Sequence, residues 1–158
     1  MAEKAQSEEL KQALTEHLEE TKGQVKRLDK VFQLIGSKAE GKECPALKGL
    51  VQETEEFISE AKNPDVLDAG LIGCAQAVEH YEIARYGTLK AWAEQLKLED
   101  AAELLEETLE EEKEADEKLT GLALGSLNEE ADEKEDEDDD KDDENENEDE
   151  EPRKKKRK

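Results

Sequence analysis

The stretch Gly-Leu-Ile-Gly-Cys-Ala-Gln-Ala-Val-Glu-His-Tyr-Glu-Ile-Ala-Arg-Tyr-Gly-Thr-Leu-Lys-Ala-Trp-Ala, residues 70–93, decides how the whole chain is interpreted. Its residue spacing predicts one long helix. The inner stripe of that helix reads Ala75, Glu79, Glu82, Tyr86, Leu89 and Ala93. Two carboxylates therefore fall one turn apart within an otherwise apolar or aromatic stripe. The stripe holds no Lys or Arg to compensate them, and burial of an unpaired carboxylate is unfavourable.

Two interpretations of Glu79 and Glu82 are open from this helix alone. In the first, both carboxylates lie on the flank of the helix and face water, as most charged side chains do. In the second, both face the interior of a helical bundle and bind a metal ion, because carboxylates one turn apart on an inward face are suited to that task. The other helices have to decide between the two.

The composition indicates one helical domain followed by a charged tail. The 158 residues carry a net charge of −24, with 44% charged and only 3% aromatic side chains. Richness in Ala, Glu, Lys and Leu is typical of helical bundles. No stretch is apolar enough for a membrane span or a signal peptide. Cys44 and Cys74 lack a Cys-x-x-Cys spacing, which favours buried small side chains in a reducing, cytoplasmic compartment over a redox pair.

A first helix is predicted over residues 7–35, with Ser7 and the acids after it as its start. Two neighbouring seams run along it. One seam has heptad-like spacing and reads Leu14, Leu18, Thr21, Val25, Leu28, Phe32 and Ile35. The other is apolar at its ends and polar in its middle, and it reads Leu10, Ala13, His17, Glu20, Gln24 and Val31. Polar groups therefore interrupt an inward face of this helix at mid-height.

Two further helices repeat this design. The helix predicted over residues 45–61 begins at a proline suited to a first helical position, and Glu53 and Glu56 border its apolar face. Asn63-Pro64 ends it, and a short link over residues 65–68 is expected before the next helix. The helix predicted over residues 99–124 has an inner stripe of Leu105, Leu109, Glu112, Asp116, Leu119 and Ala123. Acid clusters at mid-length on four helices indicate a shared centre, and a two-metal carboxylate site explains it best.

Four stretches of the chain carry a family resemblance: residues 17–28, 44–50, 68–89 and 104–116. They resemble the YciE/YciF-type ferritin-like proteins of bacterial stress responses. The most specific run is Val-Glu-His-Tyr-Glu-Ile-Ala-x-Tyr-Gly-Thr-Leu, which lies in the third stretch. The resemblance covers about residues 7 to 127. It implies an all-α, ferritin-like antiparallel four-helix bundle, a homodimer, and a centre of two iron or two manganese ions.

The superfamily pattern implied by the resemblance is a lone Glu on two helices and Glu-x-x-His on two others. The metal ligands it implies here are Glu20, Glu53, Glu56, Glu79, Glu82 and Glu112. Glu replaces His in two motifs, and Ala115 stands three residues after Glu112. Supporting or alternative ligands are His17, His80, Tyr86 and Asp116. An all-carboxylate site suits iron or manganese better than zinc. The superfamily's long crossover between its second and third helices conflicts with the short link here, so the connectivity stays open.

The end of the chain divides into two segments beyond the predicted bundle of residues 1–127. Residues 128–151 form an acidic tail that is expected to be disordered, because it has almost no apolar surface to bury. Residues 152–158, Pro-Arg-Lys-Lys-Lys-Arg-Lys, add a basic motif. That motif could fold back on the acids, act as a nuclear-import signal, or contact nucleic acid. The acidity of the bundle and of the tail disfavours DNA binding as the main function.

Two functions from different classes follow. The first is a ferritin-like dimetal protein that handles iron or peroxide during stress, with its status as an enzyme undecided. The second is a non-enzymatic acidic interaction protein whose tail binds basic partners. Only the first requires carboxylates buried in the middle of the bundle. The structure can therefore separate the two through the surroundings of these acids.

Overall fold

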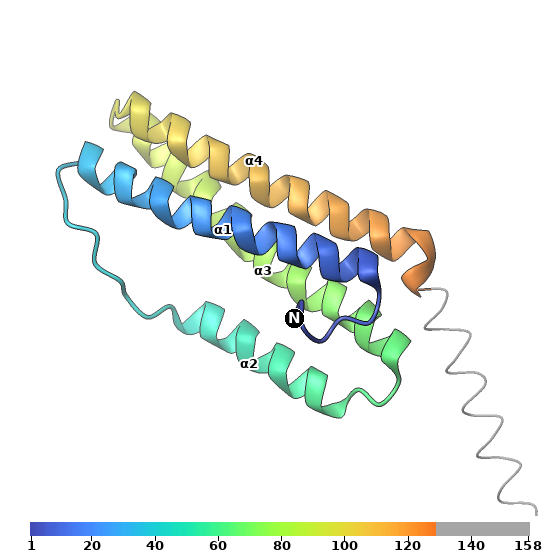
Figure 1. Ribbon diagram of the computed structural model, residues 1–158. Helices are drawn as coiled ribbons and strands as arrows, with labels where there is room; N and C mark the ends of the chain where they lie inside the picture. The colour runs from blue at the N-terminus through green and yellow to red at the C-terminus, as the bar shows by residue number, and fades with distance from the viewer. Residues whose placement is uncertain (129–158) are drawn as a thin grey trace, which may run out of the picture.

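The computed structural model describes residues 1–128 of the chain. These residues form α1 (Glu8–Leu34), α2 (Pro45–Glu60), α3 (Pro64–Gln95), α4 (Glu99–Leu122) and a π-helical turn, η1 (Ala123–Leu127). Each helix runs antiparallel to the one before it, so the connectivity is up-down-up-down (Figure 1). The predicted all-α four-helix architecture is confirmed. The predicted acidic tail and basic motif lie outside the described residues, except for Asn128.

Side chains cap the starts of α1 and α3, and α3 begins earlier than predicted. Ser7 Oγ accepts a hydrogen bond from the Leu10 N–H at the start of α1, as predicted. The prediction of a link over residues 65–68 is wrong, because α3 already begins at Pro64. The Asn63 side chain caps this helix by accepting from the backbone N–H of Asp65 and Val66. An N-cap Asn followed by Pro at the first helical position starts a helix as effectively as it ends the previous one.

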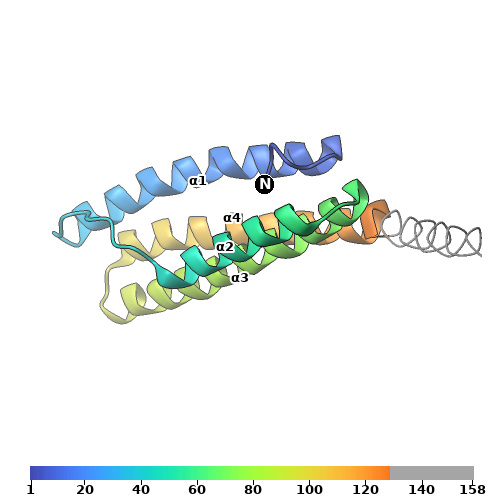
Figure 2. The same cartoon turned by 90° about the horizontal axis from the view of Figure 1, so that it is seen from below.

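The helices do not close into a symmetrical bundle. Helices α3 and α4 pack along most of their length, α1 packs on α4, and α2 packs on α3. Figures 1 and 2 show α2 separated from α1 along its course. The heptad-spaced seam of α1 is consequently half open: Leu18 is 49% exposed and Val25 is 58% exposed. Its neighbouring seam, with Leu10, Ala13 and Gln24, is the one that is buried.

Gly70 determines where α2 attaches to α3. A Cβ atom added at Gly70 would lie 1.9 Å from Cζ of Phe57, so only a glycine admits the phenyl ring at this point. The neighbouring Thr54 is buried against the same helix. Two residues before Gly70 on α3, Asp68 is buried and accepts hydrogen bonds from the backbone N–H of Gln6 and Ser7. These contacts join α2 and the start of α1 to α3.

A polar layer separates two hydrophobic cores. The core around η1 consists of Ala5, Leu10, Leu71, Ile72, Ala75, Leu119 and Leu127. The core at the α3–α4 turn consists of Val31, Tyr86, Ala93, Ala101, Ala102, Leu105 and Leu109. Along α3 the sequence passes from the first core through Glu79 and Glu82 into the second, and α4 passes back through Glu112. The predicted mid-stripe acids therefore lie between two apolar layers, and the inner stripes of α3 and α4 are confirmed apart from the exposed Leu89.

None of the helices in residues 1–128 combines the length and the apolar character that a membrane span requires.

Candidate metal centre

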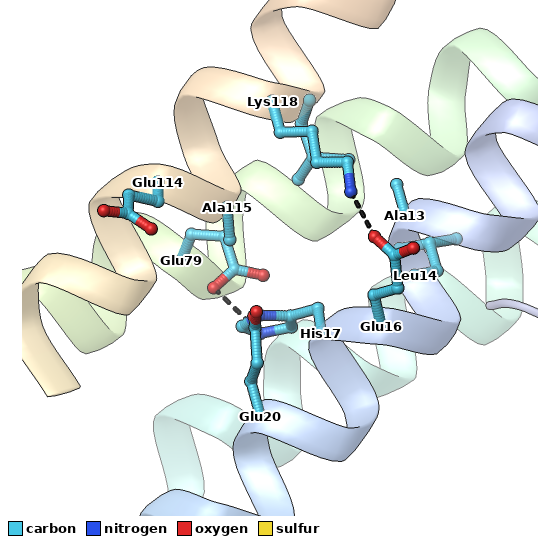
Figure 3. A pocket seen from close by; sticks show the side chains of 10 residues that line it. Ala13, Leu14, Glu16, His17, Glu20, Glu79, Glu114, Ala115 and Lys118 are labelled. Atoms are coloured by element: carbon cyan, nitrogen blue, oxygen red, sulfur yellow. Dashed lines mark hydrogen bonds and ion pairs between the residues drawn. The ribbon is translucent and has the colours of Figure 1, made fainter.

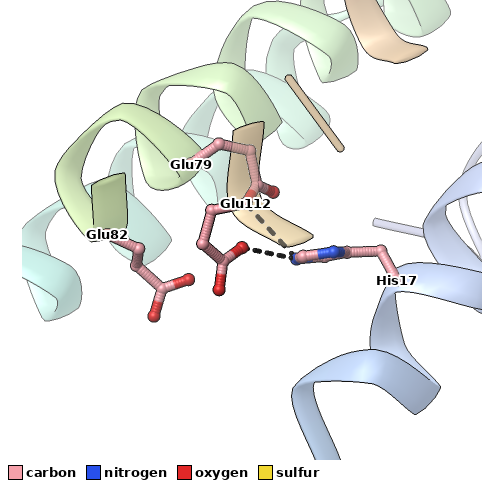
Figure 4. Close-up of side chains that lie close together, drawn as sticks. All are labelled: His17, Glu79, Glu82 and Glu112. Carbon is pink, nitrogen blue, oxygen red and sulfur yellow. Dashed lines mark ion pairs between the residues drawn. The ribbon is translucent and has the colours of Figure 1, made fainter. Parts of the chain in front are cut away.

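Four side chains from three helices meet in the polar layer. His17 comes from α1, Glu79 and Glu82 come from α3, and Glu112 comes from α4. Each offers one ligand atom, and these atoms all lie within 4.8 Å of one another. Figure 4 shows the imidazole pointing from α1 towards the carboxylates of the other two helices. Within the described residues, the number and spacing of these donor atoms would allow the group to hold a metal ion.

Helix geometry explains how so few residues form the group. Glu79 and Glu82 are three residues apart, so their side chains project from the same face of α3 one turn from each other. Glu112 lies at the middle of the buried stripe of α4, the helix that packs most extensively on α3. Because α1 packs on α4 in turn, His17 can reach the same space from the opposite side.

The imidazole of His17 touches both fully buried acids. Its Nε2 atom lies 3.3 Å from Oε2 of Glu79 and 3.6 Å from Oε2 of Glu112. Its Nδ1 atom lies 3.5 Å from Oε2 of Glu20, one turn further along α1. His17 therefore belongs to the group itself and does not stand behind it as a supporting residue.

The carboxylates are buried without adequate partners. Glu112 is 0% exposed and Glu79 is 3% exposed. Both side-chain oxygens of Glu112, Oε2 of Glu79 and Nδ1 of His17 have no hydrogen-bond partner among the described residues. Native proteins satisfy the great majority of their buried polar atoms, and each exception requires an explanation. Here the unpaired atoms converge on one another.

The surroundings raise the pKa of all three carboxyl groups. Burial raises the pKa of Glu79 to about 9, and the neighbouring Glu112 and Glu82 add to the effect. Burial raises the pKa of Glu82 to about 7, with a further contribution from the charge of Glu112. Burial also raises the pKa of Glu112 above its usual value. Without a cation, these surroundings therefore favour the protonated form of each acid more than water does.

A divalent cation would remove this electrostatic penalty. Three carboxylates and one imidazole make a mixed oxygen and nitrogen donor set without thiolate, which suits iron or manganese. The unpaired oxygens of Glu79 and Glu112 supply free lone pairs where the group converges. The residues present therefore fit a metal ion, on the grounds of burial, donor chemistry and unsatisfied atoms together.

The structure brings some of the predicted ligands together and leaves others apart. Glu79, Glu82 and Glu112 lie in the group. The side chain of Glu20 is 51% exposed and adjoins the group through His17. Glu53 and Glu56 on α2 are exposed and lie outside the group. The apolar face of α2 turns Glu56 outward, and this side chain accepts a hydrogen bond from Gln52 at 2.7 Å.

The remaining predicted ligands surround the centre. Asp116 accepts a hydrogen bond from Gln76 at 3.0 Å and lies 3.3 Å from Nε2 of His80. The side chain of His80 is 67% exposed, which places it at the surface. Tyr86 is buried one turn beyond Glu82, and burial followed by the charge of Glu82 raises its pKa to about 12. None of the three belongs to the four-residue group.

An ionic cluster that was not predicted from the sequence fixes α1 beside the centre. The guanidinium of Arg27 donates to Glu111 at 2.6 and 2.8 Å, to Glu107 at 3.0 Å and to Thr108 at 2.8 Å. The amide of the buried Gln24 donates to the same Glu111 carboxylate at 3.2 Å. A bidentate Arg–carboxylate pair of this kind fixes geometry as well as charge. In the sequence, only the i, i+4 spacing of Glu107 and Glu111 on α4 indicated that these two carboxylates share a face.

Comparison with known proteins places this geometry in context. Residues 1–132 match the family model DUF892, which is described as a domain of unknown function. Protein YciF of Escherichia coli K12 is 48% identical over 135 residues, which cover 85% of this chain and 81% of the relative. The crystal structure of the E. coli stress protein YciF superposes with a TM-score of 0.77 at 49% identity and covers 80% of each chain. A protein from Rhodopseudomonas palustris named YcfI, described as a structural protein, gives a TM-score of 0.74 at 51% identity and covers 75% of this chain and 76% of its own.

Proposed function

Since the chain belongs to the DUF892 family and is similar to YciF, we propose that it is a ferritin-like protein that binds iron or manganese and acts in a stress response. The observation that carries this proposal is the group of buried, unpartnered oxygens on Glu79 and Glu112 beside His17. A protein selected only for a stable fold would place apolar side chains in this layer, because unpaired buried carboxylates destabilise it. Retaining them suggests a ligand of opposite charge.

The chain offers donors for a two-ion centre. His17, Glu79, Glu82 and Glu112 would hold a first ion. Glu20 is the candidate donor towards a second ion, because its carboxylate adjoins the imidazole at 3.5 Å. When bound, iron or manganese would supply redox chemistry towards oxygen or peroxide. The chain itself orients the carboxylates, places Tyr86 in the adjoining apolar core, and keeps bulk water away from Glu112.

The role in stress rests on one relative. E. coli YciF is described as a stress protein. We propose the same role for this chain, and we propose that it fulfils this role by handling iron or peroxide. The alternative is a non-enzymatic interaction protein in which the bundle is only a scaffold. The R. palustris relative, described as structural, would agree with that alternative. Metal content separates the two, because a scaffold has no use for a bound transition metal.

We expect protein purified without chelator to contain iron or manganese, at a stoichiometry approaching two ions per chain. Glu79→Gln and Glu112→Gln should each lose most of this metal, because each removes a buried anionic donor while keeping the side-chain shape. Glu53→Gln and Glu56→Gln are matched controls on the exposed face of α2 and should keep it. Elemental analysis with circular dichroism on all five proteins makes the test. Metal that is absent from the wild type, or that is lost equally from the controls, would contradict the proposed centre.

We also propose that the protein is a homodimer. Large apolar side chains remain exposed on α1 and at the end of α3, where Trp92 is 62% exposed and Leu96 is 68% exposed. Large apolar side chains left exposed on a protein as charged as this one favour an interface, and a second copy of the chain offers the same side chains in an isologous contact. Val25→Glu should convert the dimer to a monomer in light scattering, while the exposed Lys26→Glu control should not. A monomeric wild type would contradict this part of the proposal.

A further inference from the structure

A cavity of about 180 Å³ lies between α1 and α4 and opens directly onto the centre. Glu79 and His17 line its buried part, with the exposed Glu16 and Lys118 to one side of them and the exposed Glu114 to the other (Figure 3). Its middle exists because α1 and α4 carry small side chains there. Ala13 and Ala115 face the cavity, and the second of these is the residue three positions after Glu112.

The lining of this cavity favours cations. Four glutamates line it against a single lysine, Lys118. A cavity with an excess of acidic side chains and apolar walls concentrates cations. Glu79 lines the buried part of the cavity and is only 3% exposed. Its Oε2 atom has no hydrogen-bond partner among the described residues. A cation that enters would therefore meet a carboxylate oxygen that is free to bind it at the end of its path.

An ion pair in an exposed part of the cavity competes with an entering cation. Nζ of Lys118 lies 2.5 Å from Oε2 of Glu16, and it holds the pKa of that carboxyl below its usual value. Both side chains are about half exposed, at 50% and 48%, so the pair forms and breaks in contact with water. While the pair is formed, Glu16 is neutralised and the ammonium group repels cations. When Lys118 swings away, Glu16 is free to receive a metal ion.

We propose that this cavity is the route by which divalent cations reach the centre, and that the Lys118–Glu16 ion pair at its mouth slows their entry. This inference rests on the proposed function, since the destination of the route is the proposed metal centre. It adds two features that metal binding alone does not require: an entry path between α1 and α4, and a basic residue that controls the rate of loading without acting as a ligand.

The test measures the rate of metal loading separately from the affinity. Apoprotein is mixed with Mn²⁺ in a stopped-flow instrument, and free Mn²⁺ is followed with a fluorescent metal indicator. Lys118→Gln should load about threefold faster or more at low salt, because a repelling charge is removed from the entry path. Its dissociation constant should match that of the wild type, because Lys118 touches no ligand of the centre. The acceleration should shrink as ionic strength rises.

Two further variants make the test specific. Lys113→Gln removes an equal charge from α4 but breaks a different exposed pair, with Glu110 at 2.7 Å, and should load as the wild type does. Ala115→Met fills the middle of the cavity and should slow loading while the melting curve stays cooperative. A wild type that fails to bind Mn²⁺ overturns the proposed function and the route together. A wild type that binds, with loading rates equal in Lys118→Gln, Lys113→Gln and Ala115→Met, overturns the route alone.

Discussion

Replacing Glu79 with leucine should stabilise the metal-free protein and destabilise the metal-loaded one. Without metal, the substitution removes a buried acid that has an unpaired oxygen and three acidic neighbours, Glu82, Glu112 and Asp116. Replacement of buried ionisable groups by apolar side chains of similar volume is often neutral or stabilising, by up to about 4 kcal/mol. With metal, the same substitution removes a ligand. A ligand at about 100 times its dissociation constant contributes about 2.7 kcal/mol to the free energy of unfolding, which the variant would then lose.

Thermal melts of the wild type and Glu79→Leu, each in chelator and in excess Mn²⁺, test the expected stabilisation without metal and the expected destabilisation with metal. Glu56→Leu is the matched control, because it makes the same chemical change on the exposed face of α2. Surface substitutions of this kind usually change stability by less than about 0.5 kcal/mol. Equal melting temperatures for Glu79→Leu and the wild type under both conditions would mean that Glu79 faces water, against its observed burial.

The sequence alone predicted the parts of this protein that depend on helical periodicity. Glu79, Glu82 and Glu112 were located because each interrupts an apolar stripe, and the stripe fixes which way a side chain points. The two apolar cores on either side of them follow from the same spacing. Periodicity assigns a residue to a face, and the burial of that face then follows from the helices packed on it.

Periodicity could not predict how far each helix sits from its neighbours. Glu53 and Glu56 have the same local pattern as the acids of α3, but α2 packs mainly on α3 and leaves them exposed. His17 was expected to support the centre, and it touches Glu79 because α1 packs closely on α4. The Arg27–Glu111 pair that helps to fix this approach joins residues 84 positions apart, a relation that no local pattern contains.

The stability of the metal-free protein should fall as pH rises from about 5 to 9, and bound metal should oppose that fall. The folded pKa of Glu79 is about 9 and that of Glu82 is about 7, both above their usual value of 4.5. The folded protein therefore holds more protons than the unfolded chain across this window. Its stability decreases with rising pH, by about 1.4 kcal/mol per pH unit for each proton.

Metal binding has the opposite dependence, because the carboxylates must lose their protons to coordinate an ion. Melting temperatures in chelator and in excess Mn²⁺ should therefore diverge as pH rises. General charge repulsion in a chain of net charge −24 also grows with pH, so Glu79→Gln is the necessary comparison. It keeps the repulsion from every other acid but removes one titrating group, and its metal-free stability should fall less steeply between pH 5 and 9. Parallel slopes for Glu79→Gln and the wild type would show that surface repulsion, and not the buried carboxylate, controls the pH dependence.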